Sequence, residues 1–333
     1  MKKALRIIFF FAIGIAFIWW FVSKLTSTEI DQMLLSFSNA NYLWFVIAIL
    51  VNIFSVFIRT KRWQQLLQPM GYNPRLLPTF LSVMSGYLAN LAVPRLGEIV
   101  RCGLLKQKEK VPFDKAIGTV IVERAIDLIL FLLILLLALF LEFNYIKDYI
   151  YNNFSQTINF DNLKNYILYF LLFLVLVSIL LYAFRKKIAN TKFYKKIIEF
   201  LKGLLEGLKS ILKLKNPLLF IFNSVFIWFL WILGTYIIFL CFDQTEHLSF
   251  KIAIITTVLG SVGPMLTPGG IGIFPAIIAE TLVIYLIAKP IGYAAGWLLW
   301  IVSQLGAVIL GLAGFIYFVQ NKKSNERDTE NTI

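Results

Sequence analysis

The sequence predicts an all-α polytopic membrane protein, with six full spans and two re-entrant helical hairpins arranged as an inverted-topology repeat. Three observations support this fold class. Of the 333 residues, 59% are hydrophobic and only 15% are charged. Several apolar runs approach the roughly 20 residues that a helix needs to cross a bilayer. The net charge of +14 lies mainly in short segments between these runs, which is typical of cytoplasmic loops rather than of a nucleic-acid-binding surface.

The first repeat, residues 1–141, is expected to contain two spans, a hairpin and a third span. The run 5–23 has Lys2 and Lys3 before it and Arg6 at its start, and it lacks a small-residue cleavage site, so it is expected to be a retained span that leaves the N-terminus in the cytoplasm. The run 42–58 returns the chain to the cytoplasm. The stretch 76–105 has basic segments on both sides, which predicts that it enters and leaves on one face. The third span follows at 116–141. The predicted loop after residue 58 contains Arg59, Lys61, Arg62 and Arg75.

The second repeat is predicted over residues 165–319, after an external loop at 142–164. It begins with a span and continues with a segment that contains ten Lys or Arg residues, of which Lys195, Lys202, Lys209 and Lys213 lie opposite an apolar face. That pattern is typical of an amphipathic helix on the cytoplasmic surface. The predicted elements are a span at 165–184, the amphipathic helix at 185–215, a span at 217–241, a re-entrant hairpin at 250–288, a span at 292–319 and a disordered cytoplasmic tail at 320–333.

Each half then has three full crossings, an odd number, so the second half must be inserted upside down relative to the first. Inverted repeats with broken helices that meet near the bilayer midplane are typical of secondary transporters. The alternative is that 76–105 is a simple span, because at about 1.5 Å per residue the part before residue 94 is nearly long enough to cross. That alternative would place the ten basic residues outside, and we therefore favour the hairpin.

Charged residues inside the apolar stretches form the first part of the candidate substrate-binding site. An unpaired charge at mid-helix costs roughly 2.5 to 3.5 kcal/mol on insertion scales, so these residues are expected to pair with one another. A structural salt-bridge network is one interpretation. Ionisable groups at membrane depth also mark pathways for polar substrates, and we favour that interpretation. The residues are Arg95, Glu98 and Arg101 after the tip of the first hairpin, and Glu123, Arg124 and Asp127 in the following span.

A glycine-rich tip in the second hairpin forms the other part of the candidate site. Gly269, Gly270 and Gly272 follow a proline and precede an apolar run. Backbone N–H groups at the start of a helix favour anions, so this tip could hold a phosphate. The alternative is a tight turn that only allows two helices to pack closely.

Other kinds of site are not predicted. Cys102, Cys241 and His247 show no metal-ligand spacing and no C-x-x-C pair, so neither a metal nor another cofactor is expected. The sequence also lacks a nucleotide-binding loop, and direct ATP hydrolysis is therefore not expected.

Four motifs together resemble the flippase-like membrane domain of lysylphosphatidylglycerol synthases. The motifs are R-T-K-R-W at 59–63, P-R-L-G-E at 94–98 with Arg101, E-R at 123–124 with Asp127, and T-P-G-G-I-G at 267–272. The resemblance covers essentially the whole chain. It implies a lipid translocase-like protein of a bacterial or archaeal cytoplasmic membrane. The chain departs from many members after the glycines, where Phe274 and Pro275 stand near the position of a glutamate.

The leading hypothesis is a lipid flippase or lipid transporter that is not an enzyme and has both termini in the cytoplasm. It would bind an anionic or zwitterionic headgroup, so its partners are membrane lipids and not nucleic acid; the oligomeric state is not predicted. One alternative is an intramembrane enzyme acting on a phospholipid or polyprenyl-phosphate headgroup, with Glu98 or Asp127 as base. Another is a non-catalytic partner of an envelope enzyme. Aminoacyl transfer is not expected, because only a short tail follows Val319.

Overall fold

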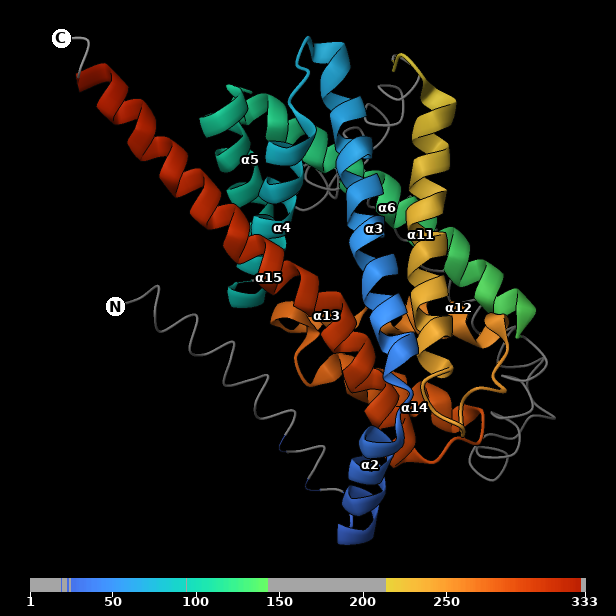
Figure 1. Ribbon diagram of the computed structural model, residues 1–333. Coiled ribbons are helices and arrows are strands. Elements are labelled where there is room, and N and C mark those ends of the chain that lie inside the picture. The colour runs from blue at the N-terminus through green and yellow to red at the C-terminus, as the bar shows by residue number, and fades with distance from the viewer. Residues whose placement is uncertain (1–18, 20–22, 24, 94, 143–213, 331–333) are drawn as a thin grey trace, which may run out of the picture. The chain divides into compact units, whose positions relative to one another are not determined.

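The computed structural model describes residues 19, 23, 25–93, 95–142 and 214–330, with side chains up to residue 320 (Figure 1). Every regular element in these ranges is helical. The chain divides by its contacts into two units, residues 1–138 with 211–333 and residues 139–210. The helices described below belong to the first unit, apart from the last turn of α6. The predictions for 5–23 and 142–215 fall almost wholly outside the described residues.

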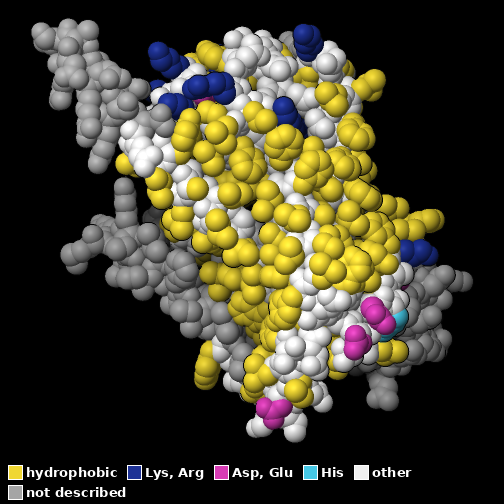
Figure 2. Space-filling model, in the orientation of Figure 1, with side chains coloured by type: hydrophobic (Ala, Val, Ile, Leu, Met, Phe, Trp, Pro, Cys, Tyr) yellow, Lys and Arg dark blue, Asp and Glu magenta, His cyan; other side chains and the backbone are white. Residues whose placement is uncertain are grey.

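Four helices in the described part of the chain are long and apolar enough to cross a membrane. They match four of the six predicted spans, and they establish an all-helical integral membrane protein. Large hydrophobic side chains are exposed on them, and Figure 2 shows these side chains as a broad band across one face. The four helices are α3 (Tyr42–Leu67, extended by the 3-10 turn η1, Gln68–Met70), α6 (Phe113–Leu141), α11 (Pro217–Phe239) and α15 (Lys289–Glu330).

Two of these helices are longer than the sequence predicts. The second span was expected to end at residue 58, but α3 continues to Leu67, and the predicted loop residues Arg59 and Arg62 are buried within it. Counting basic residues does not distinguish a loop from a helix end whose arginines have partners. Likewise, α15 continues to Glu330, past residue 319, where the last span was expected to end. An apolar span supplies the costly nucleus of a helix, and each further residue then adds a hydrogen bond.

Helices α4 (Leu76–Ala92) and α5 (Leu96–Glu109) form an antiparallel hairpin. Their backbones touch where Gly86 faces Gly97, since a Cβ built on Gly86 would lie 2.8 Å from the Gly97 carbonyl oxygen. At the turn, the side chain of Asn90 accepts a hydrogen bond of 2.7 Å from the Gly97 N–H. At the open end, Arg75 pairs with Glu109 over 3.0 Å, and this contact raises the pKa of the arginine. Both ends of the hairpin are thus held by polar contacts.

A second hairpin forms from α12 (Phe250–Gly260) and α14 (Ile273–Ile284). Between them lie the short helix α13 (Gly263–Leu266) and the 3-10 turn η3 (Pro268–Gly270). Gly260 packs against Phe274 and Ile278, which brings the two arms together. Gly269 has a φ of 58° and lies against Leu91 at the end of α4. The turn of the second hairpin therefore contacts the first hairpin close to the turn between α4 and α5.

Helix α15 packs against both hairpins, and Figure 1 shows it passing α4 and α14. Glycines allow these approaches. A Cβ on Gly311 would lie 2.8 Å from the carbonyl oxygen of Met84 in α4, and one on Gly296 would lie 2.8 Å from that of Pro275 in α14. Helix α11 packs on α3 along much of its length. Close packing through small residues is typical of helices in membranes.

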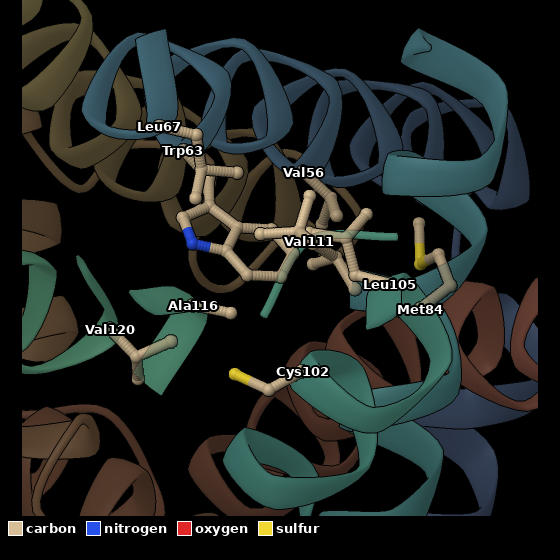
Figure 3. Close-up of a cluster of buried hydrophobic side chains, with 10 residues drawn as sticks. Val56, Trp63, Leu67, Met84, Cys102, Leu105, Val111, Ala116 and Val120 are labelled. Atoms are coloured by element: carbon tan, nitrogen blue, oxygen red, sulfur yellow. The ribbon is translucent and has the colours of Figure 1, made fainter. Parts of the chain in front are cut away.

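The buried core beside the charged residues centres on Trp63 (Figure 3). It joins side chains of α3, α4, α5 and α6, together with Val111 from the connection before α6. This core holds together the three helices that carry the charged groups of the site. Its buried members are Val56, Trp63, Leu67, Val83, Met84, Cys102, Leu105, Val111, Ala116 and Val120.

Candidate functional site: a buried arginine–carboxylate cluster

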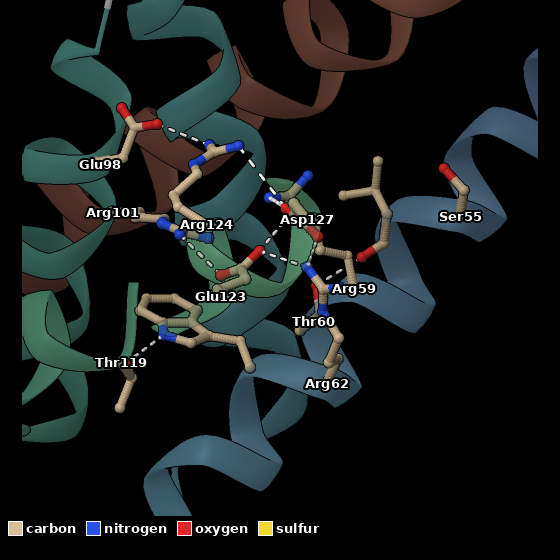
Figure 4. Close-up of polar contacts among 12 residues, drawn as sticks. Ser55, Arg59, Thr60, Arg62, Glu98, Arg101, Thr119, Glu123, Arg124 and Asp127 are labelled. Atoms are coloured by element: carbon tan, nitrogen blue, oxygen red, sulfur yellow. Dashed lines mark hydrogen bonds and ion pairs between the residues drawn. The ribbon is translucent and has the colours of Figure 1, made fainter. Parts of the chain in front are cut away.

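Glu123 of α6 lies at the centre of a buried charged cluster (Figure 4). Its Oε1 accepts from Arg59 Nε at 2.6 Å and from Arg62 Nη2 at 3.1 Å, and its Oε2 accepts from Arg101 Nη2 at 2.9 Å. The carboxylate is fully buried, so three guanidinium groups replace the water it would bind in solution. These arginines come from α3 and α5, and Glu123 therefore links three helices.

Asp127 lies one turn after Glu123 and binds the same two arginines of α3. Its Oδ2 accepts from Arg59 Nη2 at 3.0 Å, and its Oδ1 lies 2.8 Å from Arg62 Nη2. Residues four apart on a helix share a face, and so do residues three apart. The pair of carboxylates on α6 thus faces the pair of arginines on α3.

Arg124 and Glu98 form the outer part of the cluster. Arg124 Nη2 lies 2.7 Å from Glu98 Oε1, and Arg124 Nη1 is 3.9 Å from Asp127 Oδ2. The side chain of Arg124 is 44% exposed and that of Glu98 is 17% exposed, whereas those of Arg59, Arg62, Arg101 and Glu123 are almost or completely buried. The cluster is consequently accessible at its Arg124–Glu98 end.

Trp63 positions Arg101. The guanidinium carbon of Arg101 lies 4.6 Å from the centre of the Trp63 ring, within the range of a cation–π interaction. The indole Nε1–H donates a 2.9 Å hydrogen bond to Thr119 Oγ1, which fixes the orientation of the ring. The hydrophobic core and the charged cluster therefore share this side chain.

Trp63→Phe is expected to lower the free energy of unfolding by about 1 kcal/mol more than the smaller ring alone would, because it also removes the bond to Thr119. Chemical unfolding in detergent micelles would measure the loss. Trp228→Phe is a matched control, since Trp228 is also buried but its Nε1 has no hydrogen-bond partner. Equal losses in the two variants would contradict the importance of the Thr119 bond.

Comparison with known proteins identifies the family. A family model described as the lysylphosphatidylglycerol synthase TM region matches residues 7–311. The chain belongs to this family. All charged residues of the cluster lie inside the matched region. The similarity expected from the four motifs is thereby confirmed.

Two curated membrane proteins of Methanocaldococcus jannaschii are similar to this family member. UPF0104 membrane protein MJ1595 is 29% identical over 106 residues, which cover 31% of this chain and 32% of the relative. The match thus spans about a third of that protein's length. UPF0104 membrane protein MJ1078 is 26% identical over 251 residues, which cover 73% of this chain and 99% of the relative. No solved structure matches the chain.

Five of the nine predicted site residues meet in the cluster: Glu98, Arg101, Glu123, Arg124 and Asp127. Arg95 does not join them. It is exposed before α5 with a left-handed φ of 65°, and no ion pair joins it to another residue that the structure describes. The structure therefore does not bring this arginine into the ion-pair cluster.

The predicted glycines lie in the second hairpin turn, outside the ion-pair cluster. All three have positive φ: 58° at Gly269, 75° at Gly270 and 76° at Gly272. The carbonyl of Gly269 accepts from Trp300 Nε1 at 2.8 Å, and the Gly270 N–H donates to the Thr267 carbonyl at 2.9 Å. These contacts fit the turn that packs helices, which was the alternative interpretation of the motif.

Arg59 and Arg62 are the cluster residues that the site prediction missed. Both had been assigned to a cytoplasmic loop, although they also belong to the R-T-K-R-W motif. Two signals could have identified them. No glycine or proline separates residue 42 from residue 67, so a helix can continue, and the spacing of three residues places both arginines on one face.

The corrected cluster has an excess of positive charge. Four guanidinium groups face three carboxylates, which leaves a net charge of +1. Three buried donor atoms also lack a hydrogen-bond partner, namely Arg62 Nε, Arg62 Nη1 and Arg101 Nε. No group of His, Cys, Asp or Glu within the described ranges could hold a metal ion. The arrangement can bind an anion.

Proposed function

We propose that the chain is a lipid flippase or lipid transporter of the cytoplasmic membrane that binds an anionic or zwitterionic headgroup between two re-entrant hairpins. Three things support this function. The family is named for the synthesis of a phospholipid derivative, and the four long apolar helices belong in a bilayer. The third support is the buried charged cluster, which is the observation on which the proposal depends.

The proposed topology places the basic end of the molecule in the cytoplasm, together with both termini. In Figure 2, Lys and Arg gather at the end where α3 finishes and α4 begins, and Asp and Glu gather toward α2 (Ser27–Asn39) at the other end. The hairpin α4–α5 would enter from the basic end and the hairpin α12–α14 from the opposite end. Their turns touch through Gly269 and Leu91, which supports hairpins that meet inside the membrane in an inverted repeat.

The cluster is costly to keep inside a membrane helix bundle. Apolar packing would hold α3, α5 and α6 together at least as well, because buried ion pairs stabilise a fold little compared with hydrophobic residues of similar size. Seven charged groups at one point therefore favour a polar substrate over a purely structural network. In this proposal the arginines contact the headgroup, the acyl chains stay in lipid, and the two halves of the molecule move alternately to open each side.

The contacts favour transport over intramembrane catalysis. A general base needs a carboxylate that is free to take a proton from the substrate. Glu123 accepts from three guanidinium groups. Asp127 forms ion pairs with Arg59 and Arg62, and Glu98 pairs with Arg124. The two inner carboxylates, Glu123 and Asp127, are thus already held by arginines, and the proposal does not include a chemical reaction.

Reconstitution in liposomes tests the proposed function. Wild-type protein should move fluorescently labelled phospholipids between leaflets faster than protein-free vesicles do. Arg124→Gln should lower the rate about tenfold, equivalent to about 1.4 kcal/mol, because it removes the accessible guanidinium of the cluster. Arg75→Gln, which removes another ion-paired and exposed arginine, is the control and should keep the wild-type rate.

A wild-type rate no higher than that of empty vesicles, across anionic and zwitterionic lipids, would contradict the flippase proposal. Mass spectrometry of the recovered lipids completes the experiment. A chemically changed headgroup would favour the enzyme alternative instead.

A further inference from the structure

We infer that the arginine–carboxylate cluster binds one phosphodiester monoanion, which displaces Glu98 from Arg124 and accepts from the free donors of Arg62 and Arg101. This inference rests on the proposed function and names the chemical class that the site recognises. Its arguments are the charge balance, the unpaired donors and the weak attachment of Glu98.

The charge balance leaves room for a single negative charge. Arg59, Arg62, Arg101 and Arg124 carry four positive charges, against the three negative charges of Glu98, Glu123 and Asp127. Excess charge in a poorly solvated place is unfavourable unless a counter-charge is bound. A phosphodiester has one negative charge shared by two oxygens, so it would neutralise the cluster.

The free donors show which side chains would hold that anion. Arg62 is completely buried, and its Nε and Nη1 have no hydrogen-bond partner. Arg101 is 4% exposed, and its Nε has no partner either. Buried donors are rarely left unpaired in folded proteins. The planar guanidinium fork matches phosphate oxygens and can donate two parallel bonds to them, as a lysine cannot.

The arginines that carry these donors share carboxylate partners with one another and with Arg124. Arg62 and Arg101 bind opposite oxygens of Glu123, while Arg62 and Arg124 both approach Asp127. The three arginines therefore converge on one part of the cluster from α3, α5 and α6. An anion bound at Arg124 would therefore enter the same ion-pair network that holds the other two arginines.

Glu98 is the carboxylate that an incoming anion can replace most easily. It is attached through one oxygen to Arg124, at 2.7 Å, while its Oε2 has no hydrogen-bond partner. Glu123, in contrast, binds three arginines through both oxygens. Glu98 and Arg124 are also the most exposed pair of the cluster. In the structure, the Glu98 carboxylate occupies the position on Arg124 that the phosphodiester would take.

Binding to the full-length chain in neutral detergent tests the inference. Isothermal titration calorimetry would use two probes with the same anion, dihexanoylphosphatidylglycerol as the lipid and dimethyl phosphate as the free phosphodiester. Glu98→Gln removes the competing charge and should tighten binding by at least about tenfold. Because Glu98 is partly exposed and singly bonded, this variant is expected to fold.

Glu109→Gln is the matched control, since Glu109 lies on the same helix and also pairs with an arginine, Arg75. It changes the net charge equally and should leave the affinity unchanged. The inference is overturned if neither probe binds, if Glu98→Gln binds no tighter than wild type, or if Glu109→Gln tightens binding as much. Tighter binding of only the lipid probe identifies a headgroup as the source of the anion, and tighter binding of both identifies the phosphodiester alone as sufficient.

This experiment is independent of the transport assay. Specific binding without lipid movement would leave the anion site in place and remove the flippase proposal. Lipid movement without tighter binding by the Glu98→Gln variant would keep the flippase proposal and remove the anion site.

Discussion

Replacing Glu123 with glutamine is expected to lower the free energy of unfolding by about 3 to 5 kcal/mol, the usual cost of removing one partner of a buried ion pair. Three guanidinium groups would lose their central counter-charge, and the side chains of Arg59, Arg62 and Arg101 are almost or completely buried. Since whole proteins are stable by roughly 5 to 15 kcal/mol, this loss would remove a large part of the total stability. Thermal unfolding and the monodisperse fraction on size exclusion would measure this loss.

Asp114→Asn is the control for the loss of a carboxylate from the same helix. Asp114 is exposed in the first turn of α6, where a negative charge interacts only with the helix dipole, so the expected loss is about 0.3 to 1 kcal/mol. A Glu123→Gln protein that unfolds at the wild-type temperature would show that the arginines find other acceptors, and it would contradict the central role of Glu123.

Replacing Gly97 with alanine is expected to destabilise the α4–α5 hairpin by about 1 to 3 kcal/mol, as other overpacking substitutions do. A Cβ on Gly97 would overlap the backbone carbonyl of Gly86 and the side chain of Asn90. The contact is with backbone, so a change of rotamer cannot relieve it. Opening of the hairpin would also move Glu98, the next residue. Chemical unfolding in micelles would measure the loss of stability.

Gly103→Ala is a control variant for which the expected change in the free energy of unfolding has the opposite sign. Gly103 lies on the same helix and a Cβ there meets nothing within 4 Å. Alanine favours the helix over glycine by about 1 kcal/mol, so this variant should be as stable as wild type or more stable. If both alanine variants gained stability, the close approach of Gly86 and Gly97 would not be a constraint on the hairpin.

Long apolar runs predicted the four long apolar helices well, because whether a run can be buried in lipid depends on its length and composition alone. Helix α11 begins at Pro217, where the span was predicted, and proline is favoured in the first turn of a helix. The break between α4 and α5 follows from Pro94, which cannot continue a helix. The predicted end of the second span was too early, because charge counting treats every arginine as solvated. In the structure, Arg59 and Arg62 instead lie within α3 and have carboxylate partners on α6.

The charged half of the candidate site was partly predictable, because charges at membrane depth must find partners. The partners themselves depend on tertiary structure. Arg59 is separated from Glu123 by 64 residues, and only the tertiary fold brings their side chains within 2.6 Å. Arg95 itself adopts a left-handed backbone conformation at the hairpin turn, and composition does not predict this conformation. For the same reason, spacing alone could not show that the Gly269 carbonyl binds Trp300.

The packing of α15 on α4 has a consequence for the order of assembly. The ribosome makes α15 after every other described helix, yet α15 supplies the surface against which the early helix α4 packs, where Ser85 donates to the Gly311 carbonyl at 3.2 Å. During synthesis, α4 is therefore made before one of the two helices against which it packs most closely. Incompletely packed intermediates are prone to misassembly and degradation. A chain that is interrupted before α15 would therefore leave this surface of α4 without its packing partner.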